Sequence, residues 1–503
     1  MSHLRRHRPR RVHALLAALG LATLALVPLG AGSAPAATPA AKAAPKPSAD
    51  HSVVANLWEW NWPSVARECT DVLGPQGYGA VQVAPPQDSL KRTHLGDGSD
   101  TVLHPWWEVY QAVDYALTSR MGDEQQFRDM VTTCRASGVK VYVDAVINHT
   151  TGQGDTSYGG RHYTHFDYPD APWTDADFHH KGDECTSSTG GIDDFNNQQQ
   201  VFSCELVGLA DLDTGQATVR DRLASYLNRL IGYGVSGFRV DAAKHVGQTD
   251  LDAIYARLHT TKDGTRPYWA LEVFGGGPGT LSPDAFTGSG TVLGLDGVKQ
   301  LKSAFKSYPD NAPGSIATLR DFGEGSGLTA SDKTLSFVQN HDTERNGDAL
   351  SYKDGATNRL ATQYLLASGY GRPQVYAAFE FAASDDSPPA TADGAITDTT
   401  CGAGWSCTDR DAAVNALVRF HNGVGDAAQA NWWDDGANTI AFSRGSKGWV
   451  AFNNDPAAHT ITVSTGLPKG SYRDLVGGAT VRVDAKGRTT VSVPAKGAVA
   501  VLR

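Results

Sequence analysis

Hydrophobic runs rich in β-branched and aromatic residues recur through the middle of the chain, and each run ends in a polar or charged residue. Runs of this composition and length predict buried strands. They are Val139–Asp144, Val235–Asp241, Tyr268–Glu272 and Leu335–Asn340. The stretches between such runs are long enough for helices, and two of these are predicted at Glu124–Ala136 and Gln216–Leu230.

This order of strands and helices predicts an α/β fold, a barrel of parallel strands followed by helices. In such a barrel the carboxyl ends of all strands meet on one rim, where residues distant in the sequence converge. An acidic segment ends or follows each predicted strand: Asp144–His149, Gly237–His245, Glu272–Phe274 and Phe337–Asp342. We therefore expect these carboxylates to share one active site.

Two regions depart from the barrel pattern. Residues 149–206 form a stretch rich in Gly, Asp and His, and an insertion of this length is usually functional or ordered by a ligand. From residue 411 to residue 503, short alternating segments separated by Gly and Pro turns predict an antiparallel β-domain. We therefore assign the barrel to residues 51–148 and 207–410, on either side of the insertion.

The first 36 residues have the features of a secretory signal peptide. They contain five arginines, then an apolar run from Ala14 to Leu29, then the small-residue site Ala34–Ala36. The apolar run is short for a membrane anchor, and residues 37–50 predict a flexible leader. Removal of residues 1–36 takes the formal net charge from −10 to −15. This charge disfavours nucleic acid and suits a secreted, extracellular protein. No membrane attachment is expected once the signal peptide is removed, and a monomer is the default expectation.

Six cysteines in an exported chain favour three disulfides, although their spacing alone leaves the connectivity open. The chain has no Cys-x-x-Cys pair and no His-Glu-x-x-His helix. A redox motif or a zinc-protease site therefore has little support.

The acidic residues of the predicted rim suit cleavage of a glycosidic bond. Asp241 lies two residues after Arg239 on one strand, so the guanidinium can keep the carboxylate ionised, as a nucleophile requires. Glu272 lies between two apolar residues, which raises a carboxyl pKa and suits a general acid. With Asp342 as a third acid, one group can attack the anomeric carbon while another protonates the departing oxygen. A single acid more often caps a helix, but four acidic segments in barrel order are hard to explain in that way.

The motifs that carry these acids resemble the four conserved regions of the α-amylase family, glycoside hydrolase family 13. They are DAVINH from Asp144, GFRVDAAKH from Gly237, Glu272 after its strand, and FVQNHD from Phe337. The likeness is to the animal-type branch, which has bacterial members, and it extends over about residues 51–503. It includes Trp58–Trp60, Gly79–Pro86, Pro105–Gln111, Phe127–Met130 and Arg419–Asn422.

The resemblance implies a (β/α)8 TIM barrel, an inserted domain B after the third strand and a C-terminal antiparallel β-sandwich domain. It implies that Asp241 is the nucleophile, Glu272 the general acid/base and Asp342 the transition-state stabiliser of a retaining hydrolase. The positions that match the family's sugar-binding residues are Trp106, Trp107, Tyr110, Gln111, Asp144, His149, Arg239, Lys244, His245 and His341.

A structural calcium ion is also implied, held by the side chains of Asn148 and Asp211 and the backbone carbonyls of Phe202 and His245. Many animal-type members bind an activating chloride through two arginines and an asparagine. Here Arg239 and Asn340 match, but Gln374 takes the position of the second arginine, so we expect a weakened chloride site. Arg372, two residues earlier, is the nearest replacement cation in the sequence. The implied disulfides are Cys69–Cys134, Cys185–Cys204 and Cys401–Cys407.

The expected function is that of a secreted, calcium-dependent, endo-acting α-amylase. It would hydrolyse internal α-1,4-glucosidic bonds of starch, glycogen and related maltooligosaccharides with retention, through a covalent glycosyl-enzyme. A transglycosylase or an exo-acting relative shares this chemistry and stays open. A non-catalytic glucan-binding protein is a further alternative, but such a protein would lack Asp241, Glu272 or Asp342, and all three are present.

Overall fold

The computed structural model of the chain describes residues 52–95, 101–306 and 314–503. The predicted signal peptide, residues 1–36, and the leader, residues 37–50, lie outside the described residues. None of the described helices is long and apolar enough to cross a membrane.

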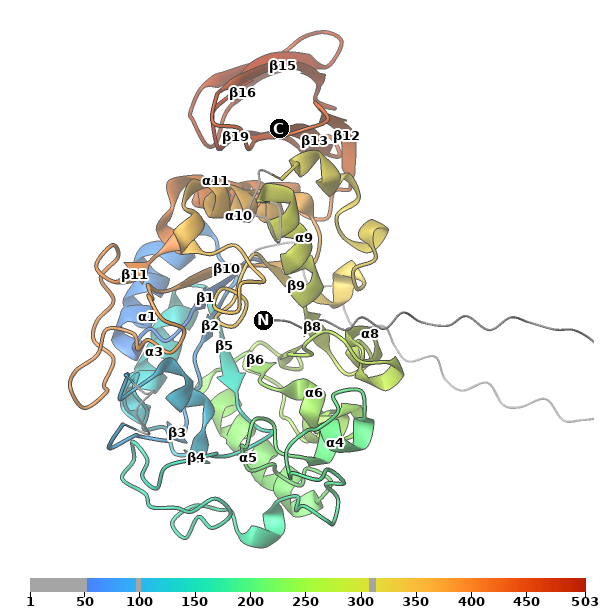
Figure 1. Ribbon diagram of the computed structural model, residues 1–503. Helices are drawn as coiled ribbons and strands as arrows, with labels where there is room; N and C mark the ends of the chain where they lie inside the picture. Colours follow the sequence, from blue (N-terminus) through green and yellow to red (C-terminus); the bar gives the residue numbers. More distant parts are fainter. Residues whose placement is uncertain (1–51, 96–100, 307–313) are drawn as a thin grey trace, which may run out of the picture. The chain divides into compact units, whose positions relative to one another are not determined.

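In the described part of the chain, eight parallel strands close into a barrel, as predicted (Figure 1). Each strand pairs with the next in chain order, and the last pairs with the first. The strands are β1 (Val54–Leu57), β2 (Ala80–Val83), β5 (Lys140–Ala145), β6 (Gly237–Val240), β7 (Tyr268–Leu271), β8 (Thr291–Leu293), β9 (Thr334–Phe337) and β10 (Arg372–Phe379). A short strand, β11 (Trp405–Ser406), adds antiparallel to β10, and β3 (Asp88–Ser89) pairs with β4 (Ala112–Asp114).

The four strands predicted from hydrophobic runs coincide with β5, β6, β7 and β9. Their residues are almost all buried, because the strands pack on each other inside the barrel and on helices outside it. Asp144 is part of β5, while Asp241 and Glu272 directly follow β6 and β7. The strand ends therefore bring the predicted catalytic acids to one rim.

The described α-helices are α1 (Trp62–Glu68), α2 (Gly74–Gln76), α3 (Glu124–Ala136), α4 (Gln198–Ser203), α5 (Ala217–Tyr233), α6 (Ala243–Val246), α7 (Gln248–Ala256), α8 (Pro283–Phe286), α9 (Leu295–Phe305), α10 (Ala356–Ser368) and α11 (Ala412–Val424). The two predicted helices are α3 and α5. Helix α3 begins with a capping box between Asp123 and Gln126. It buries one stripe of residues at helical spacing, namely Phe127, Met130, Val131 and Cys134. The disulfide Cys69–Cys134 joins this stripe to the residue that follows α1.

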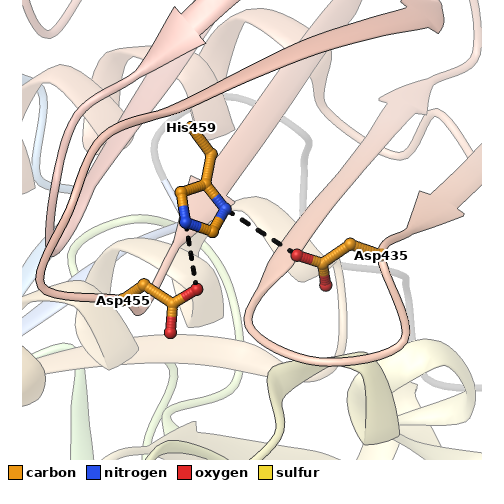
Figure 2. Close-up of side chains that lie close together, drawn as sticks. All are labelled: Asp435, Asp455 and His459. Atoms are coloured by element: carbon orange, nitrogen blue, oxygen red, sulfur yellow. Dashed lines mark ion pairs between the residues drawn. The ribbon is translucent and has the colours of Figure 1, made fainter.

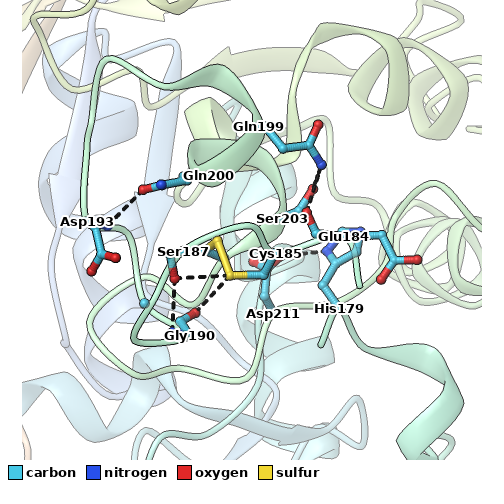
Figure 3. Close-up of a disulfide and its surroundings, with 12 residues drawn as sticks. His179, Glu184, Cys185, Ser187, Gly190, Asp193, Gln199, Gln200, Ser203 and Asp211 are labelled. Atoms are coloured by element: carbon cyan, nitrogen blue, oxygen red, sulfur yellow. Dashed lines mark hydrogen bonds and ion pairs between the residues drawn. A yellow bond between two sulfur atoms is a disulfide. The ribbon is translucent and has the colours of Figure 1, made fainter. Parts of the chain in front are cut away.

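The segment between β5 and α5 contains little regular structure apart from α4, in agreement with an insertion after the third strand. Arg161 attaches it to the β3–β4 pair through ion pairs with Asp88 at 3.2 Å and Asp114 at 2.8 Å. The disulfide Cys185–Cys204 closes its far part (Figure 3). Near this disulfide, the Ser187 hydroxyl accepts a hydrogen bond from the Gly190 amide at 2.9 Å.

The C-terminal strands form an antiparallel sandwich, also as predicted. They are β12 (Gln429–Asp434), β13 (Thr439–Arg444), β14 (Gly448–Asn453), β15 (His459–Ser464), β16 (Gly470–Arg473), β17 (Thr480–Val483), β18 (Arg488–Val493) and β19 (Gly497–Leu502). Strands β12, β13, β14 and β19 make one sheet, which shares a core with β15, β17 and β18. Strands β13 and β14 are buried on both faces, because side chains on their other face join the core beside α10 and α11.

Helix α11 is a correction to the expectation of β-structure from residue 411 onward. Residues 412–424 form a helix that packs on α10. Its N-terminus is capped by Asp411, whose side chain accepts bonds from the amides of Ala413 and Val414. The alternating pattern that predicts strands starts only at β12.

An ion-pair bridge links two loops of the sandwich (Figure 2). The His459 ring lies between two carboxylates: Nδ1 is 3.9 Å from Asp435 Oδ2 and Nε2 is 3.3 Å from Asp455 Oδ2. A metal ion would need both carboxylates on the side of one ring nitrogen, whereas here they approach opposite nitrogens. His459 therefore joins the β12–β13 turn to the β14–β15 loop through its contacts with the two carboxylates. From that loop, Asn454 Nδ2 donates to the Phe305 carbonyl of α9 at 3.0 Å.

Arg444, the last residue of β13, holds the sandwich to the barrel helices. It is buried, and its guanidinium donates to the carbonyls of Ala427 at 2.6 Å, Ala367 at 2.7 Å and Gly425 at 3.1 Å. Burial lowers the pKa of Arg444 to about 10, so it remains charged at neutral pH.

We predict that Arg444→Met destabilises the protein by about 3 kcal/mol, because three buried carbonyls lose a charged donor. Differential scanning calorimetry should show a lower Tm. Arg473→Met on β16, where the side chain is exposed, is the matched control and should leave the Tm unchanged. Equal Tm values for the two variants would contradict this role of Arg444.

Candidate active site

The rim of the barrel holds a cluster of three acids around one arginine. Arg239 Nη1 donates to Asp144 Oδ1 at 2.7 Å and to Asp241 Oδ1 at 2.6 Å. Arg239 Nη2 donates to Glu272 Oε1. The other oxygen of Glu272 accepts a bond from the Ala242 amide at 2.9 Å. One guanidinium therefore orients three carboxyl groups that come from three neighbouring strands.

The backbone is strained beside this cluster. Ala242, directly after Asp241, has φ +48°, in the left-handed region that residues with a side chain rarely adopt. This conformation aims the Ala242 amide at Glu272. Strained backbone of this kind clusters at functional sites, where surrounding structure holds it in place.

The carboxyl groups of the rim are hard to ionise because they are buried. Burial raises the pKa of Asp144 to about 7 and, together with the nearby Glu272 charge, that of Asp342 to about 8. Burial also raises the pKa of Asp241 and Glu272, and Arg239 opposes the rise. The expectation that Arg239 keeps Asp241 ionised was too simple, because the arginine serves several acids at once. Burial therefore favours the protonated forms of these acids, and Arg239 favours the ionised forms.

Two residues of the predicted sugar-binding set extend the cluster. His149 Nε2 lies 3.0 Å from the Tyr110 carbonyl and 3.8 Å from Asp241 Oδ2. Burial lowers the pKa of His149 to about 4, so the ring is neutral at neutral pH. The Tyr110 hydroxyl donates to Asp144 Oδ2 at 3.0 Å and accepts from Trp58 Nε1 at 3.0 Å.

Stacked rings lie beside the acids. His341 stacks on Trp58, with ring centroids 4.7 Å apart and an interplanar angle of 8°, and on Tyr110, at 5.1 Å and 19°. His341 Nε2 is 3.3 Å from Asp342 Oδ2, so this stack reaches the third predicted catalytic acid. Sequence reasoning did not single out Trp58 as a site residue, although the Trp58–Trp60 motif directly after β1 marks its position.

The Trp106–Trp107 pair lies in a 3-10 helix, Trp106–Tyr110. Trp106 contacts the His341 ring at 5.4 Å and donates from its indole to the Ser384 carbonyl. Trp107 instead lies 5.4 Å from the Arg92 guanidinium. Both indoles are partly exposed, which leaves ring surface for a sugar.

The remaining predicted sugar-binding residues have contacts of their own. Lys244 Nζ donates to the carbonyls of Phe274 at 3.1 Å and Gly276 at 2.8 Å, in the loop after Glu272. Gln111 accepts a bond from the Gly152 amide at 3.0 Å, so it supports the inserted segment.

The predicted calcium ligands lie in two contacts, one between residues that flank the inserted segment and one between that segment and the barrel. Asn148 Nδ2 donates to Asp211 Oδ1 at 3.1 Å, and both residues are buried. At the second contact, His245 Nδ1 is 3.0 Å from the Val201 carbonyl, next to Phe202. Burial raises the pKa of Asp211 to about 6. Asp211 and Asn148 are both buried and carry side-chain oxygens, the type of ligand that calcium prefers.

His179 is a residue of this region that the sequence did not indicate. Its Nδ1 is 2.7 Å from Asp211 Oδ2 (Figure 3). Its Nε2 is 3.2 Å from Asp213 Oδ1. Burial lowers the pKa of His179, but the bond to Asp211 and the charges of both aspartates outweigh it and raise the pKa above its usual value. The histidines of residues 149–206 have no regular spacing, so the sequence does not indicate that His179 contacts Asp211.

Gln374, at the position where the second chloride-binding arginine was expected, pairs with another neutral side chain, Gln82. Gln374 Nε2 donates to Gln82 Oε1 at 2.9 Å, and both side chains are buried. Arg372 does not replace the missing cation, because its Nη1 donates to the Tyr142 hydroxyl at 2.9 Å and its guanidinium lies 4.7 Å from the Tyr268 ring. Asn340 accepts a bond from the Thr343 amide at 2.9 Å.

The six cysteines form the disulfides Cys69–Cys134, Cys185–Cys204 and Cys401–Cys407, the pairs that the resemblance implies.

Comparison with known families and proteins agrees with this site. Residues 81–266 match the family model for the α-amylase catalytic domain, and residues 431–503 match the model for the α-amylase C-terminal all-β domain. An α-amylase of Streptomyces violaceus is 41% identical, over 95% of this chain and 78% of its own length. Pancreatic α-amylase of Sus scrofa is 36% identical, over 87% of this chain and 89% of its own length.

Comparison with solved structures also finds α-amylases. The crystal structure of α-amylase I from Eisenia fetida superposes with a TM-score of 0.83 at 35% identity, covering 90% of this chain and 97% of that one. A mutant of the same enzyme, in a complex with maltohexaose, superposes equally well at 34% identity. The chain described here therefore belongs to the α-amylase family of glycoside hydrolases, glycoside hydrolase family 13.

Proposed function

We propose that this α-amylase is endo-acting and hydrolyses internal α-1,4-glucosidic bonds of starch, glycogen and related maltooligosaccharides with retention of configuration. The observation that carries the proposal is the Arg239 guanidinium, which contacts both Asp241 and Glu272. Two carboxyl groups on one guanidinium favour the separation of about 5 Å that retaining enzymes use over the wider spacing of inverting ones. The Eisenia fetida relative was solved with maltohexaose, an α-1,4-glucan fragment, which supports the same substrate class here.

In the proposed first step, an ionised Asp241 oxygen bonds to the anomeric carbon while the glycosidic bond breaks. Glu272 transfers its proton to the departing oxygen. In the second step a water molecule attacks the anomeric carbon, Glu272 takes the proton, and the bond to Asp241 breaks. Two inversions restore the α-configuration. Asp342 acts as the transition-state stabiliser.

These steps require an ionised Asp241 and a protonated Glu272, and the surroundings of each group favour that state. Asp241 accepts a bond from Arg239 at 2.6 Å, which favours its ionised form over that of acids without a cation. The raised pKa of Glu272 keeps its proton available near neutral pH. Because both pKa values are raised, the pH–rate profile should be displaced upward. Activity should fall at low pH as Asp241 becomes protonated and at high pH as Glu272 loses its proton.

The first prediction is that Glu272→Gln lowers kcat on soluble starch by about 10³- to 10⁴-fold, since the amide cannot donate a proton. Glu324→Gln changes an exposed acid outside the site and should leave kcat unchanged. Viscosity should fall faster than reducing ends appear in the wild type, which is the sign of internal cleavage. NMR of fresh products should show α-anomers. Products of β-configuration, or glucose and maltose released from chain ends without viscosity loss, would contradict the proposal.

We also propose that one calcium ion lies between the inserted segment and the barrel, held by Asn148, Asp211 and the carbonyls of Phe202 and His245. A calcium ion there would supply positive charge beside the buried Asp211 and cross-link the two segments. The support is the pair of contacts already described, Asn148 with Asp211 and the end of α4 with His245.

For calcium, we predict that a chelator lowers the Tm of the wild type and has little further effect on Asp211→Asn. An ion that binds only the folded chain stabilises it by about 4 kcal/mol at 1,000 times its Kd. Asp183→Asn, an exposed change in the same segment, should keep the chelator effect. Calorimetric titration of the chelated protein should show one site. A wild-type Tm that does not respond to chelator would contradict the calcium proposal.

For chloride, we predict that the wild-type rate is independent of chloride when acetate holds the ionic strength constant. The neutral Gln374–Gln82 pair offers no second positive charge for an anion. Gln374→Arg should introduce chloride activation, and the uncharged Gln374→Met should not. A severalfold rate increase of the wild type with chloride would contradict this prediction.

We propose further that residues 1–36 direct secretion and are removed, and that the product acts as a monomer. The basic start, the apolar run and the small-residue site of these residues support export. Three disulfides fit an oxidising extracellular environment.

A further inference from the structure

His341 lies in a stack of aromatic rings with an arginine close to each neighbouring ring. On one side its ring stacks on Trp58, and the Arg345 guanidinium lies 4.7 Å from the centre of that indole. On the other side it stacks on Tyr110, and the Arg239 guanidinium lies 5.8 Å from the centre of that phenol. Arg239 belongs to the acid cluster, whereas Arg345 has no part in the proposed reaction.

Arg345 is fixed in place by an aromatic cage and by two hydrogen bonds. Its guanidinium lies 4.2 Å from the Phe381 ring and 5.0 Å from the Phe379 ring, and its side chain is 5% exposed. Its Nη1 donates to the His341 carbonyl at 3.0 Å and to Glu344 Oε1 at 2.6 Å. A charge held this firmly in buried surroundings acts over a distance that water would otherwise screen.

We propose that Arg345 is a positioning residue which, together with Arg239, keeps the His341 ring neutral and seated in its stack, ready to bind a sugar hydroxyl. A neutral imidazole offers one donor and one acceptor nitrogen, whereas an imidazolium offers only donors. If His341 were protonated, only one aromatic ring would separate its positive charge from each of the two guanidiniums, and these like charges would repel. This inference rests on the proposed function, because the hydroxyl belongs to the glucan bound at the acid cluster.

The other charges around His341 agree with a neutral ring. Asp342 is 3.3 Å from His341 Nε2 and would favour an imidazolium if ionised, but burial raises its own pKa to about 8. Glu344 is paired with Arg345, and burial raises its pKa to about 7. Glu59, next to Trp58, is fully buried and its pKa is raised to about 8. Burial and the charges of the two arginines together lower the pKa of His341 well below its usual value.

The test is Arg345→Met in the full-length enzyme, with the ionisation of His341 followed by NMR of histidine-labelled protein. The His341 signals are identified by their loss in His341→Asn. We expect the variant ring to gain its proton at a higher pH than the wild-type ring, because one of the two nearby positive charges is lost while burial and Arg239 remain. A protonated ring has no acceptor nitrogen, so kcat/KM of the variant should fall more than that of the wild type between pH 7 and pH 5.5.

Three control variants separate charge from packing. Arg345→Lys keeps the charge and should keep the wild-type pH profile. Glu344→Gln removes a neighbouring negative charge, which would favour an imidazolium. The fall of kcat/KM on the acidic side of the pH profile should therefore not move to higher pH. The double variant Arg345→Met/His341→Asn should show the same acid limb as His341→Asn alone, because the effect of Arg345 is transmitted through the imidazole.

The outcomes also separate this inference from the proposed function. Starch hydrolysis with retention, combined with a His341 titration that Arg345→Met does not change, would overturn the inference and leave the function intact. A wild-type His341 that titrates near 6.5 would overturn it even if Arg345→Met does not fold. A neutral His341 in a protein that does not cleave starch would uphold the effect of Arg345 and remove the proposed function.

Discussion

The site depends on the bonds of one buried guanidinium to three carboxyl groups. Arg239 is the nearest cation to Asp144, Asp241 and Glu272, and it holds each of them by a direct hydrogen bond. Buried carboxylates without such a cation would protonate or force the structure open. Because burial favours the protonated forms and three acids share one positive charge, a protonated acid beside an ionised one is favoured over three ionised acids. An acid and a nucleophile can therefore occur side by side near neutral pH.

The barrel provides the geometry for this sharing. Asp144, Asp241 and Glu272 reach Arg239 because β5, β6 and β7 are neighbours with their carboxyl ends on one rim. The inserted segment starts beside the same rim, because it follows Asn148, which lies three residues after the end of β5, and the contact of Asn148 with Asp211 brings its two ends together. The sandwich contributes from further away through Arg444, which joins it to the barrel helices. The acids, the inserted segment and the sandwich are thus linked to one another through the barrel.

Local patterns made part of this predictable from the sequence. The apolar runs that became β5, β6, β7 and β9 have strand length and end in polar residues, so both the strands and the rim positions could be read directly. The Trp58–His341–Tyr110 stack could not be predicted from the sequence. Its members are far apart in the chain and meet only when the barrel closes. The raised pKa of Asp241 was missed for the same reason, since burial depends on packing.

The most direct test of the account is to trap the glycosyl-enzyme. A fluorinated α-glucosyl fluoride that slows the second step would leave a sugar on the nucleophile, and mass spectrometry of the digested protein would locate it. The account predicts one adduct, on the peptide that contains Asp241, and none in Asp241→Asn. An adduct on Glu272 or Asp342, or turnover to β-configured products without any adduct, would contradict the central claim that Arg239 holds Asp241 as the nucleophile and Glu272 as the acid.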